Sequence, residues 1–271
     1  SRDAPYFGFE IPDAPGKFFY VWLDAPIGYM ASFMNFAKEN KLSFDDFWKK
    51  NSETELVHFI GKDILYFHAL FWPATLEYSG YRKPTKIYAH GFLTVNGEKM
   101  SKSRGTFITA RSYLDNIKNP NFLRYYYASK LNDSMEDIDL NLDDFLAKVN
   151  SDLVGKFINI PSRTSGFISK YFQNKLLPLE KIQDEKGNKL VLEIMGIKDL
   201  VTKYYESRMY SKLVKLVMSQ VETLNEFISS KEPWVLAKDD DQQKVNSDLH
   251  QICSLCLHSF RLISIYLTPI I

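Results

Sequence analysis

The segment 99–103 reads Lys-Met-Ser-Lys-Ser and is the most informative chemical pattern in the sequence. It lies between Gly97 and Gly105, and glycines favour a loop with an adaptable backbone. Two ammonium groups on such a loop can stabilise the charge that develops when a polyphosphate leaves during a transfer reaction. The pattern therefore predicts phosphate chemistry, with Lys99 and Lys102 as the side chains that would contact the phosphates. An ordinary basic surface loop is the alternative.

This segment follows a predicted strand and resembles the second signature of class I aminoacyl-tRNA synthetases. Segments 21–29, V-W-L-D-A-P-I-G-Y, and 59–64, F-I-G-K-D-I, are similar to the amino-acid pocket of the methionyl members of that class. The similarity extends in register from Ser1 to Ile271. The resemblance implies a ligase that uses ATP and Mg²⁺ to activate L-methionine, and that then transfers the amino acid to tRNA(Met).

Two features of that family are missing from the chain, namely an H-I-G-H-type signature and a cysteine-rich zinc-binding insertion. The resemblance therefore implies the second half of a Rossmann-like catalytic domain, followed by an anticodon-binding domain. We expect this chain to be inactive by itself, because its active site would be incomplete, and to be a monomer. Zinc is expected only in the upstream part of the parent enzyme, and no metal ligands are expected within this chain.

The resemblance also implies which residues bind the amino acid. In an open α/β sheet, ligands bind beyond the carboxyl ends of the strands, where residues 25–29 and 61–64 are predicted to lie. Ile64 and His68 are four residues apart and share one face of a predicted helix. Sulfur against aromatic rings contributes about 0.3–1.5 kcal/mol. Taken singly, the aromatic residues have an alternative role in the core, and the histidine a structural one. The expected walls of a slot for a thioether, with small Ala25 leaving room, are Trp22, Pro26, Tyr29, Ile64 and His68.

A further set of residues is implied to bind ATP. The family places Gly61 and Asp63 near the ribose, and the backbone around His90 and Gly91 near the adenine. Arg2 matches an arginine near the phosphates. An alternative role for Asp63 is that of N-cap of the helix that follows it. The methionine carboxylate itself attacks the α-phosphorus of ATP, so the reaction requires positioning and positive charge and no protein base.

Asn159, Arg163 and Trp234 match the residues with which the family reads the anticodon. Asn159 and Arg163 are four residues apart on one predicted helix face, and Trp234 follows a second long helix. Unpaired bases are recognised by stacking on aromatic rings and by hydrogen bonds to their edges, and these side chains offer both. For Trp234 the alternative is a plug between helices.

Strand-like and helix-like stretches alternate over the first 130 residues, as a parallel α/β sheet requires. Predicted strands cover Phe18–Asp24, Leu56–Ile60 and Lys86–Leu93, the second being closed by Gly61. Predicted helices cover Tyr29–Glu39 and the stretch from Ile64 to Phe71, which Asp63 would cap. The pair Asn96-Gly97 predicts a tight turn before the segment 99–105.

After Lys130 the strand-like runs end, and three helical patterns follow at about 142–172, 196–230 and 243–268. Lys175–Asn188 contains Pro178 and Gly187 and is predicted to be a loop. The predicted fold is thus α/β followed by all-α, a partial Rossmann-like parallel sheet with a helical bundle. The predicted domains are residues 1–130 and 144–271, joined by an acidic linker at 131–143.

The net charge of +1 conceals an uneven distribution. Six acids and no base lie between Asp133 and Asp144, whereas residues 145–220 carry thirteen Lys or Arg against seven Asp or Glu. A polyanion could bind the basic segment, and a solvated helical surface is the alternative. The apolar runs are too short to cross a bilayer, so no membrane is expected as a partner. The resemblance implies tRNA, and not DNA, as the nucleic-acid partner.

Cys253 and Cys256 have the spacing of half a zinc site or of a redox pair. They also fall on an apolar helical stripe, which favours a role as small core residues. Free thiols point to the cytoplasm.

Three functions compete at this stage. The first is a fragment of an ATP-dependent ligase, the second a related nucleotidylyltransferase, and the third a purely RNA-binding helical module. The pocket segments argue against the second, and the complete segment 99–103 argues against the third.

Overall fold

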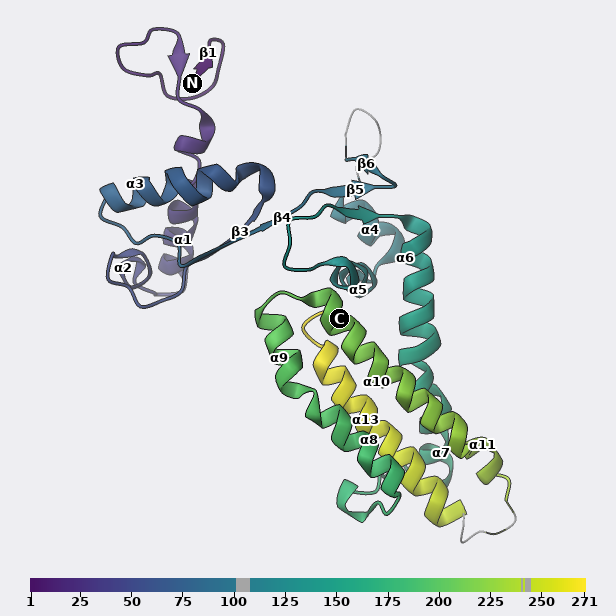
Figure 1. Ribbon diagram of the computed structural model, residues 1–271. Coiled ribbons are helices and arrows are strands. Elements are labelled where there is room, and N and C mark those ends of the chain that lie inside the picture. Colours follow the sequence, from purple (N-terminus) through teal and green to yellow (C-terminus); the bar gives the residue numbers. More distant parts are fainter. Residues whose placement is uncertain (101–107, 240, 242–244) are drawn as a thin grey trace. The chain divides into compact units, whose positions relative to one another are not determined.

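The computed structural model describes residues 1–271 except 101–107, 240 and 242–244 (Figure 1). The chain forms two compact units. Unit 1 comprises Ser1–Phe92 with Ser134–Asp137, and unit 2 comprises Leu93–Asp133 with Ile138–Ile271. The first boundary between the two compact units follows Phe92. The functional domains inferred from the sequence, with their linker at 131–143, stay a prediction.

A parallel pair of strands forms the centre of unit 1. Strand β3 (Val57–Gly61) pairs with β4 (Lys86–His90), in a register from Val57 opposite Lys86 to Gly61 opposite His90. Parallel strands need a long crossover connection. Here it is the helical stretch of η2 (Lys62–Ile64), η3 (Phe67–Phe71) and α3 (Trp72–Tyr78). The strand predicted at 56–60 and the crossover helix are confirmed. The strand predicted at 86–93 is correct only as far as His90, because Leu93 begins β5 of the other unit.

The start of unit 1 differs from the prediction. Strands β1 (Arg2–Asp3) and β2 (Lys17–Phe18) pair antiparallel, but the strand expected to continue to Asp24 is wrong. Val21–Leu23 forms the turn η1, in which the Ala25 amide donates to the Val21 carbonyl at 2.8 Å. The periodicity of a short apolar run does not distinguish a strand from a helical turn, and this turn leaves Val21 and Leu23 exposed. The chain then enters α1 (Ile27–Glu39), which confirms the predicted helix and begins two residues earlier.

The core of unit 1 is small and aromatic. Trp48 from α2 (Phe44–Trp48), Trp72 and Leu76 are at most 3% exposed, and partly buried side chains such as Phe33 and Tyr81 pack around them. Large rings that meet at tilted and edge-on angles can fill a small core without a second layer of helices.

Unit 2 begins with a small sheet. Strand β5 (Leu93–Val95) lies between β6 (Glu98–Lys99), which is antiparallel to it, and β7 (Ile138–Leu140), which is parallel. Asn96 and Gly97 connect β5 to β6 with φ angles of 49° and 78°. Positive φ at both central residues is what a tight hairpin turn requires, so that prediction is confirmed. The expectation that strands end at Lys130 is wrong, because β7 lies beyond that residue. Its three residues are too few to show an alternating pattern in the sequence.

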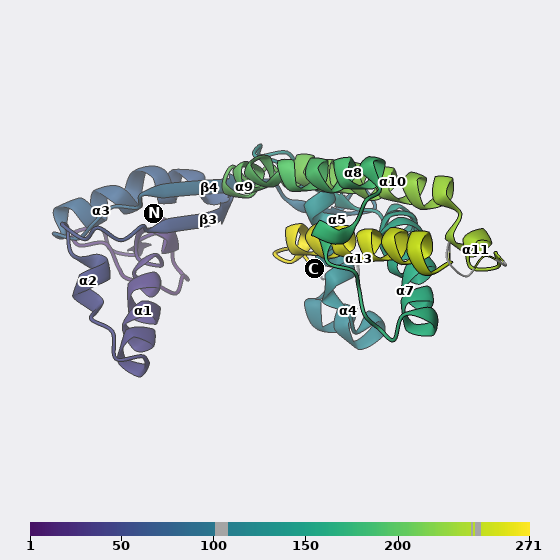
Figure 2. The same ribbon diagram turned by 90° about the horizontal axis from the view of Figure 1, so that it is seen from below.

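The rest of unit 2 is helical. Its elements before residue 172 are α4 (Ala110–Ile117), α5 (Pro120–Lys130), α6 (Leu142–Lys148), η4 (Val149–Phe157) and α7 (Asn159–Tyr171). The later elements are η5 (Leu179–Lys181), α8 (Glu185–Gly196), α9 (Lys198–Glu206), α10 (Tyr210–Lys231), α11 (Pro233–Leu236), η6 (Val245–Leu249) and α13 (His250–Leu267). Helices α7, α8 and α10 all pack against α13 (Figures 1 and 2). The predicted helical bundle is confirmed.

The loop predicted at 175–188 is only partly correct. Helix α8 begins at Glu185, and the Asp184 side chain caps it by accepting from the Gly187 amide at 2.8 Å. A Cβ atom on Gly187 would lie 2.4 Å from Leu255 Cδ1 and 3.1 Å from Phe227 Cζ. This glycine therefore allows close helix packing and does not mark a loop. The pattern predicted from 196 to 230 also divides, because Arg208 has a φ of 58°.

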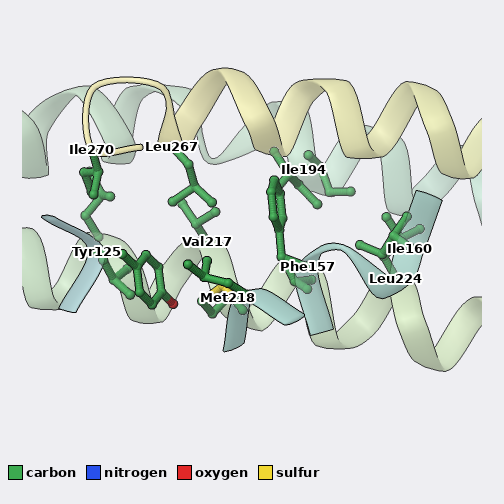
Figure 3. Packing of buried hydrophobic residues seen from close by; sticks show 14 of the residues in the cluster. Tyr125, Phe157, Ile160, Ile194, Val217, Met218, Leu224, Leu267 and Ile270 are labelled. Carbon is green, nitrogen blue, oxygen red and sulfur yellow. The ribbon is translucent and has the colours of Figure 1, made fainter. Parts of the chain in front are cut away.

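The core of unit 2 joins side chains that are distant in sequence (Figure 3). Phe157 and Ile160 meet Val217 and Leu224 of α10, and Leu267 of α13 closes the same cluster. Cys253 and Cys256 are free thiols with 0% exposure, which confirms their prediction as core residues. Burial raises the pKa of the Cys253 thiol to about 12. Within the described parts of the chain, no helix is both long enough and apolar enough to span a membrane.

Candidate functional site

Tyr29 and His68 are joined by a hydrogen bond in unit 1. The Tyr29 hydroxyl lies 2.9 Å from His68 Nε2, and His68 Nδ1 lies 3.0 Å from the Ile64 carbonyl oxygen. A carbonyl oxygen only accepts, so in the neutral imidazole Nδ1 carries the proton and Nε2 accepts from the tyrosine. His68 is 0% exposed, and burial raises the pKa of Tyr29. Both side chains are therefore held in defined orientations.

Trp22 completes an aromatic cluster with these two residues. Its ring centroid is 5.4 Å from that of His68, in an edge-on arrangement, and 6.1 Å from that of Phe67. Tyr29 and His68 are 5.8 Å apart by the same measure. We call Trp22, Tyr29, Phe67 and His68 the Trp22 cluster. Four of the predicted amino-acid-binding residues, Trp22, Tyr29, Ile64 and His68, thus come together, while Ala25 and Pro26 lie in the connection from η1 to α1.

Two residues of this region were missed in the sequence. His58 on β3 is 8% exposed, and its Nε2 atom accepts a hydrogen bond of 3.3 Å from the Trp72 indole. Its ring centroid lies 5.1 Å from that of Tyr29 and 5.6 Å from that of His68. Strand alternation offered a signal, because His58 and Ile60 share the buried face of β3 while Phe59 is exposed.

The residues expected to bind ATP meet at the carboxyl ends of β3 and β4. Gly61 and His90 are register partners, and the Asp63 carboxylate lies over Gly61, where an added Cβ would be 2.7 Å from its Oδ1 atom. The N-cap role considered for Asp63 is wrong, because Gly61 occupies the cap position and Asp63 lies inside the turn η2. Asp63 is exposed there.

Gly91 is required by close packing. A Cβ atom there would lie 2.1 Å from the Glu136 carbonyl oxygen, a backbone atom that cannot move aside easily. Asp137 fixes this segment, since its Oδ1 atom accepts from the Phe92 amide and from Lys62 Nζ, each at 2.7 Å. His90 Nδ1 donates to the Gly91 carbonyl at 2.8 Å. The end of β4 is thereby held against residues 134–137.

The predicted phosphate-binding residues lie on short strands. The Arg2 guanidinium on β1 stacks over Tyr20, with Cζ 4.4 Å from the ring centroid. Lys99 on β6 is opposite Thr94 and exposed, and Met100 packs against the core of unit 2. Lys102 lies outside the described residues. Among the residues that the structure describes, no group of three or more His, Cys, Asp or Glu side chains is placed to hold a metal ion.

Two of the residues expected to read an anticodon, Asn159 and Arg163, lie along the contact between α7 and α10, and the third, Trp234, lies on α11 beside Arg163. Asn159 Nδ2 donates to Asn225 Oδ1 at 3.1 Å, and both terminal nitrogens of Arg163 lie 3.2 Å from Ser229 Oγ. The Arg163 guanidinium also stacks over Trp234, with Cζ 4.6 Å from the ring centroid. The sequence predicted that Asn159 and Arg163 share one helix and that Trp234 follows another, but it did not show that Arg163 and Trp234 touch.

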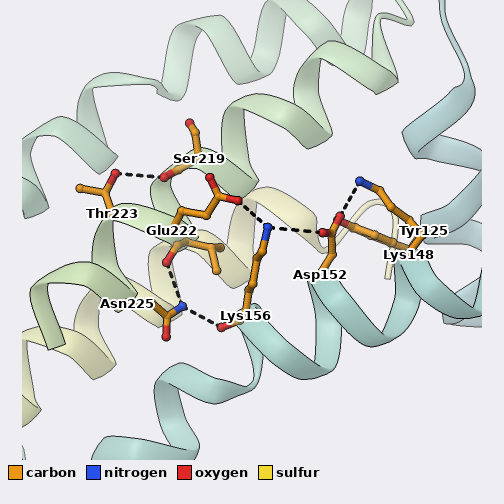
Figure 4. Close-up of polar contacts among 9 residues, drawn as sticks. Tyr125, Lys148, Asp152, Lys156, Ser219, Glu222, Thr223 and Asn225 are labelled. Carbon is orange, nitrogen blue, oxygen red and sulfur yellow. Dashed lines mark hydrogen bonds and ion pairs between the residues drawn. The ribbon is translucent and has the colours of Figure 1, made fainter. Parts of the chain in front are cut away.

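The same contact continues as a polar seam toward α5 (Figure 4). Asn225 donates to the Lys156 carbonyl at 2.9 Å, and Lys156 pairs with Glu222, whose hydrogen bond raises the lysine pKa. Asp152, whose side chain is 7% exposed, accepts from Tyr125 and pairs with Lys148, each at 2.8 Å. Burial and the Asp152 carboxylate raise the pKa of Tyr125.

Comparison with known proteins identifies the family. The family model described as tRNA synthetases class I (M) matches residues 1–165. The methionine–tRNA ligase of Thiobacillus denitrificans is 61% identical over the whole chain, that of Nitrosomonas europaea 58%, and one from Neisseria meningitidis 54%. The chain belongs to the class I tRNA synthetase (M) family. It spans 38% of the length of each of these curated relatives.

Solved members of the synthetase family share the fold. The Mycobacterium tuberculosis methionyl-tRNA synthetase in complex with methionyl-adenylate aligns with a TM-score of 0.78 at 23% identity. The alignment covers 99% of this chain and 51% of that one. A second structure, the apo form from the same organism, aligns with a TM-score of 0.76. The predicted fold class, a partial Rossmann-like sheet followed by helices, is confirmed.

Proposed function

We propose that the full-length protein activates L-methionine with ATP, forming methionyl-adenylate, and then transfers the amino acid to tRNA(Met). The relatives at 54–61% identity carry the name methionine–tRNA ligase, and they match this chain along its whole length. The observation that carries the proposal in the structure is the Trp22 cluster, in which three predicted pocket residues converge. Because the chain spans 38% of those relatives, the activity is proposed for the full-length protein.

The Trp22 cluster suits an unbranched thioether side chain. Tyr29 and His68 satisfy each other by hydrogen bonding, and the accessible part of the cluster includes ring surface of Tyr29 and Trp22, with the His68 ring buried directly behind them. Sulfur beside aromatic rings gains about 0.3–1.5 kcal/mol per contact. We propose that Trp22, Tyr29 and His68 contact the methionine side chain, with Ile64, Pro26 and the small Ala25 completing the site.

ATP, as its Mg²⁺ complex, is the proposed co-substrate. Gly61 and Asp63 would contact the ribose, and the backbone of His90 and Gly91 the adenine, because both pairs lie at the carboxyl ends of parallel strands. Arg2 would contact the phosphates. Zinc stays an expectation for the upstream part of the protein only.

Positive charge and positioning would drive the reaction. The methionine carboxylate attacks the α-phosphorus of ATP and pyrophosphate leaves, after which the terminal ribose hydroxyl of tRNA attacks the adenylate carbonyl and AMP leaves. Lys99 and Lys102 would stabilise the negative charge on the phosphates as it develops. This role needs no change in the protonation of either lysine.

We propose that Asn159, Arg163 and Trp234 read the anticodon of tRNA(Met), the sequence C-A-U. The stacked Arg163 and Trp234 side chains offer a flat surface to a base, and Asn159 lies four residues from Arg163 on the same helix. The basic excess in residues 145–220 would attract the RNA backbone. A cytoplasmic location and a monomeric state of this chain complete the proposal.

Methionine-dependent exchange of pyrophosphate into ATP by the full-length protein tests this function. We expect exchange with methionine, and much weaker exchange with other amino acids. Exchange that depends on another amino acid would contradict the choice of methionine as substrate, and no exchange with any amino acid would favour a related nucleotidylyltransferase. Binding of tRNA without any exchange would favour the purely RNA-binding alternative.

A further inference from the structure

His58 lies beneath the Trp22 cluster, and three elements surround its side chain. It comes from β3, where it is opposite Ile87 of β4, and it meets Tyr29 of α1, His68 of η3 and Trp72 of α3. With 8% exposure it is nearly excluded from solvent. A histidine buried at this junction contacts two proposed methionine-binding residues and also the aromatic core of unit 1.

The hydrogen bond from Trp72 fixes the proton of His58. An indole nitrogen only donates, so His58 Nε2 must present its lone pair, and the neutral ring carries its proton on Nδ1. Burial, and then the proximity of His68, lower the pKa of His58 to about 4. The titratable side chains in ring contact with His58 are Tyr29 and His68, and neither is an anion that would favour a charged His58.

The two neighbouring rings depend on this arrangement. His58 is 5.1 Å from Tyr29 and 5.6 Å from His68 between ring centroids, and Tyr29 and His68 are bonded to each other. A shift of the His58 ring would therefore move both partners of that hydrogen bond. The Trp72 indole holds the His58 ring by its hydrogen bond, and Trp72 belongs to the small core with Trp48.

We infer that His58 is a positioning residue for the amino-acid site. Its neutral ring, fixed by the Trp72 hydrogen bond, holds Tyr29 and His68 in the orientation that receives the methionine side chain. This inference rests on the proposed function. It adds that the shape of the site is set by a histidine that accepts a hydrogen bond from the core and contacts the substrate through its neighbours only.

Substitutions at His58 in the full-length protein separate this role from a general effect on folding. His58→Phe keeps a ring against Tyr29 and His68 but removes the acceptor for Trp72. His58→Gln keeps an acceptor on a side chain of similar reach. We expect His58→Phe to raise the KM for methionine about tenfold, with kcat changed less than about twofold and the KM for ATP unchanged. His58→Gln should stay within about threefold of the wild-type KM.

A double substitution tests whether the indole bond is responsible. Trp72→Phe removes the donor, so that adding it to His58→Phe should raise the KM for methionine less than the product of the two single effects. His258→Phe, in the helical bundle, is the matched control, and its KM for methionine should equal that of the wild type. Independent, multiplying effects of the two single substitutions would overturn the inference.

A spectroscopic measurement reports the proton directly. In the full-length protein with ¹⁵N-labelled histidine, the signal absent from the His58→Gln variant should show a bare Nε2 and a protonated Nδ1. It should remain neutral from pH 8 down to about pH 5.5, since an unperturbed imidazole titrates near 6.5. A His58 signal that titrates between pH 6 and 7 would overturn the inference.

The kinetic outcomes distinguish the two proposals. An active wild-type protein with an unchanged KM for methionine in His58→Phe would overturn the inference alone. The same would follow if both KM values and kcat changed in parallel with the melting temperature, because that pattern reports folding only. A wild-type protein without methionine-dependent exchange would overturn the proposed function, and the inference with it.

Discussion

The two regions proposed to bind ligands are supported in different ways. The Trp22 cluster draws on η1, α1 and η3, and it rests on a core of three fully buried residues. Unit 1 also exposes large apolar side chains, among them Phe59 at 68%, Tyr66 at 70% and Leu70 at 60%. Asn159, Arg163 and Trp234 instead lie on helices that share the large core of unit 2. Unit 2 also exposes some large apolar side chains, such as Leu146 at 58% and Leu192 at 67%, but unit 1 exposes more of them for its length and has the smaller core.

This difference has a physical consequence. Many exposed apolar side chains beside a small core indicate a region against which another part of a protein packs. The chain spans 38% of its curated relatives, so we propose that part of the remaining sequence covers unit 1. The bundle should keep its structure without that cover.

The difference between the two regions should be largest when this chain is studied without the rest of the protein. We predict that the isolated chain shows no methionine-dependent pyrophosphate exchange, because the site for two substrates would be half built. The helical bundle should nevertheless unfold cooperatively, as measured by the loss of its α-helical circular dichroism signal. Measurable exchange by the purified chain would contradict this prediction.

Removal of the second signature lysine should have the next largest effect. Lys102→Ala in the full-length protein should lower kcat for adenylate formation by roughly a hundredfold or more, with the affinity for methionine nearly unchanged. The reason is that this ammonium would act on charge that develops in the transition state. Presteady-state measurement of adenylate formation checks it, and an unaltered kcat would remove Lys102 from the mechanism.

Gly91→Ala should destabilise unit 1 by about 1–3 kcal/mol, the cost of overpacking a rigid site. The new Cβ would meet the Glu136 carbonyl at 2.1 Å and displace residues 134–137. Gly166→Ala is the control, because nothing lies within 4 Å of a Cβ atom there and the residue is inside α7. Urea unfolding should show a loss for the first variant and a gain of about 0.5–1 kcal/mol for the second. Equal stability of both variants would refute the packing argument.

Asp152→Ala should destabilise unit 2 by about 1–3 kcal/mol, because it leaves the buried Tyr125 hydroxyl without its acceptor. Glu222→Ala, in the same polar seam, removes an exposed pair and should cost less than about 1 kcal/mol. Denaturant midpoints of the two variants provide the measurement. A larger loss of stability for Glu222→Ala than for Asp152→Ala would show that burial does not determine how much each polar contact of the seam contributes to stability.

The sequence predicted the regular elements better than their contacts. Strands β3 and β4 and the amphipathic helices were predicted because their periodicity is local. The turn η1 was not, since the periodicity of the short apolar run from Phe18 suits a strand and a helical turn equally. Gly187 was wrongly taken as a sign of a loop. A glycine is needed there because Leu255, far away in the sequence, packs closely against it.

The candidate site shows the same limit. Pattern and resemblance identified Trp22, Tyr29 and His68, which the structure brings together. His58 and Trp72 were missed because their importance lies in one hydrogen bond across the fold. The stacking of Arg163 on Trp234 likewise depends on the packing of α11 after the left-handed residue Glu232, with a φ of 45°.

The central claim is that methionine activation and anticodon recognition belong to separate regions of the chain. Trp234→Ala in the full-length protein tests it most directly, when tRNA charging and pyrophosphate exchange are measured side by side, with Trp234→Phe as the conservative control. Stacking contributes about 1–3 kcal/mol per base, so charging at limiting tRNA should fall by roughly ten- to a hundredfold. Exchange without tRNA should stay normal, and Trp234→Phe should retain most of the charging. If charging and exchange fall together, or neither changes, Trp234 is a structural plug and the account is contradicted.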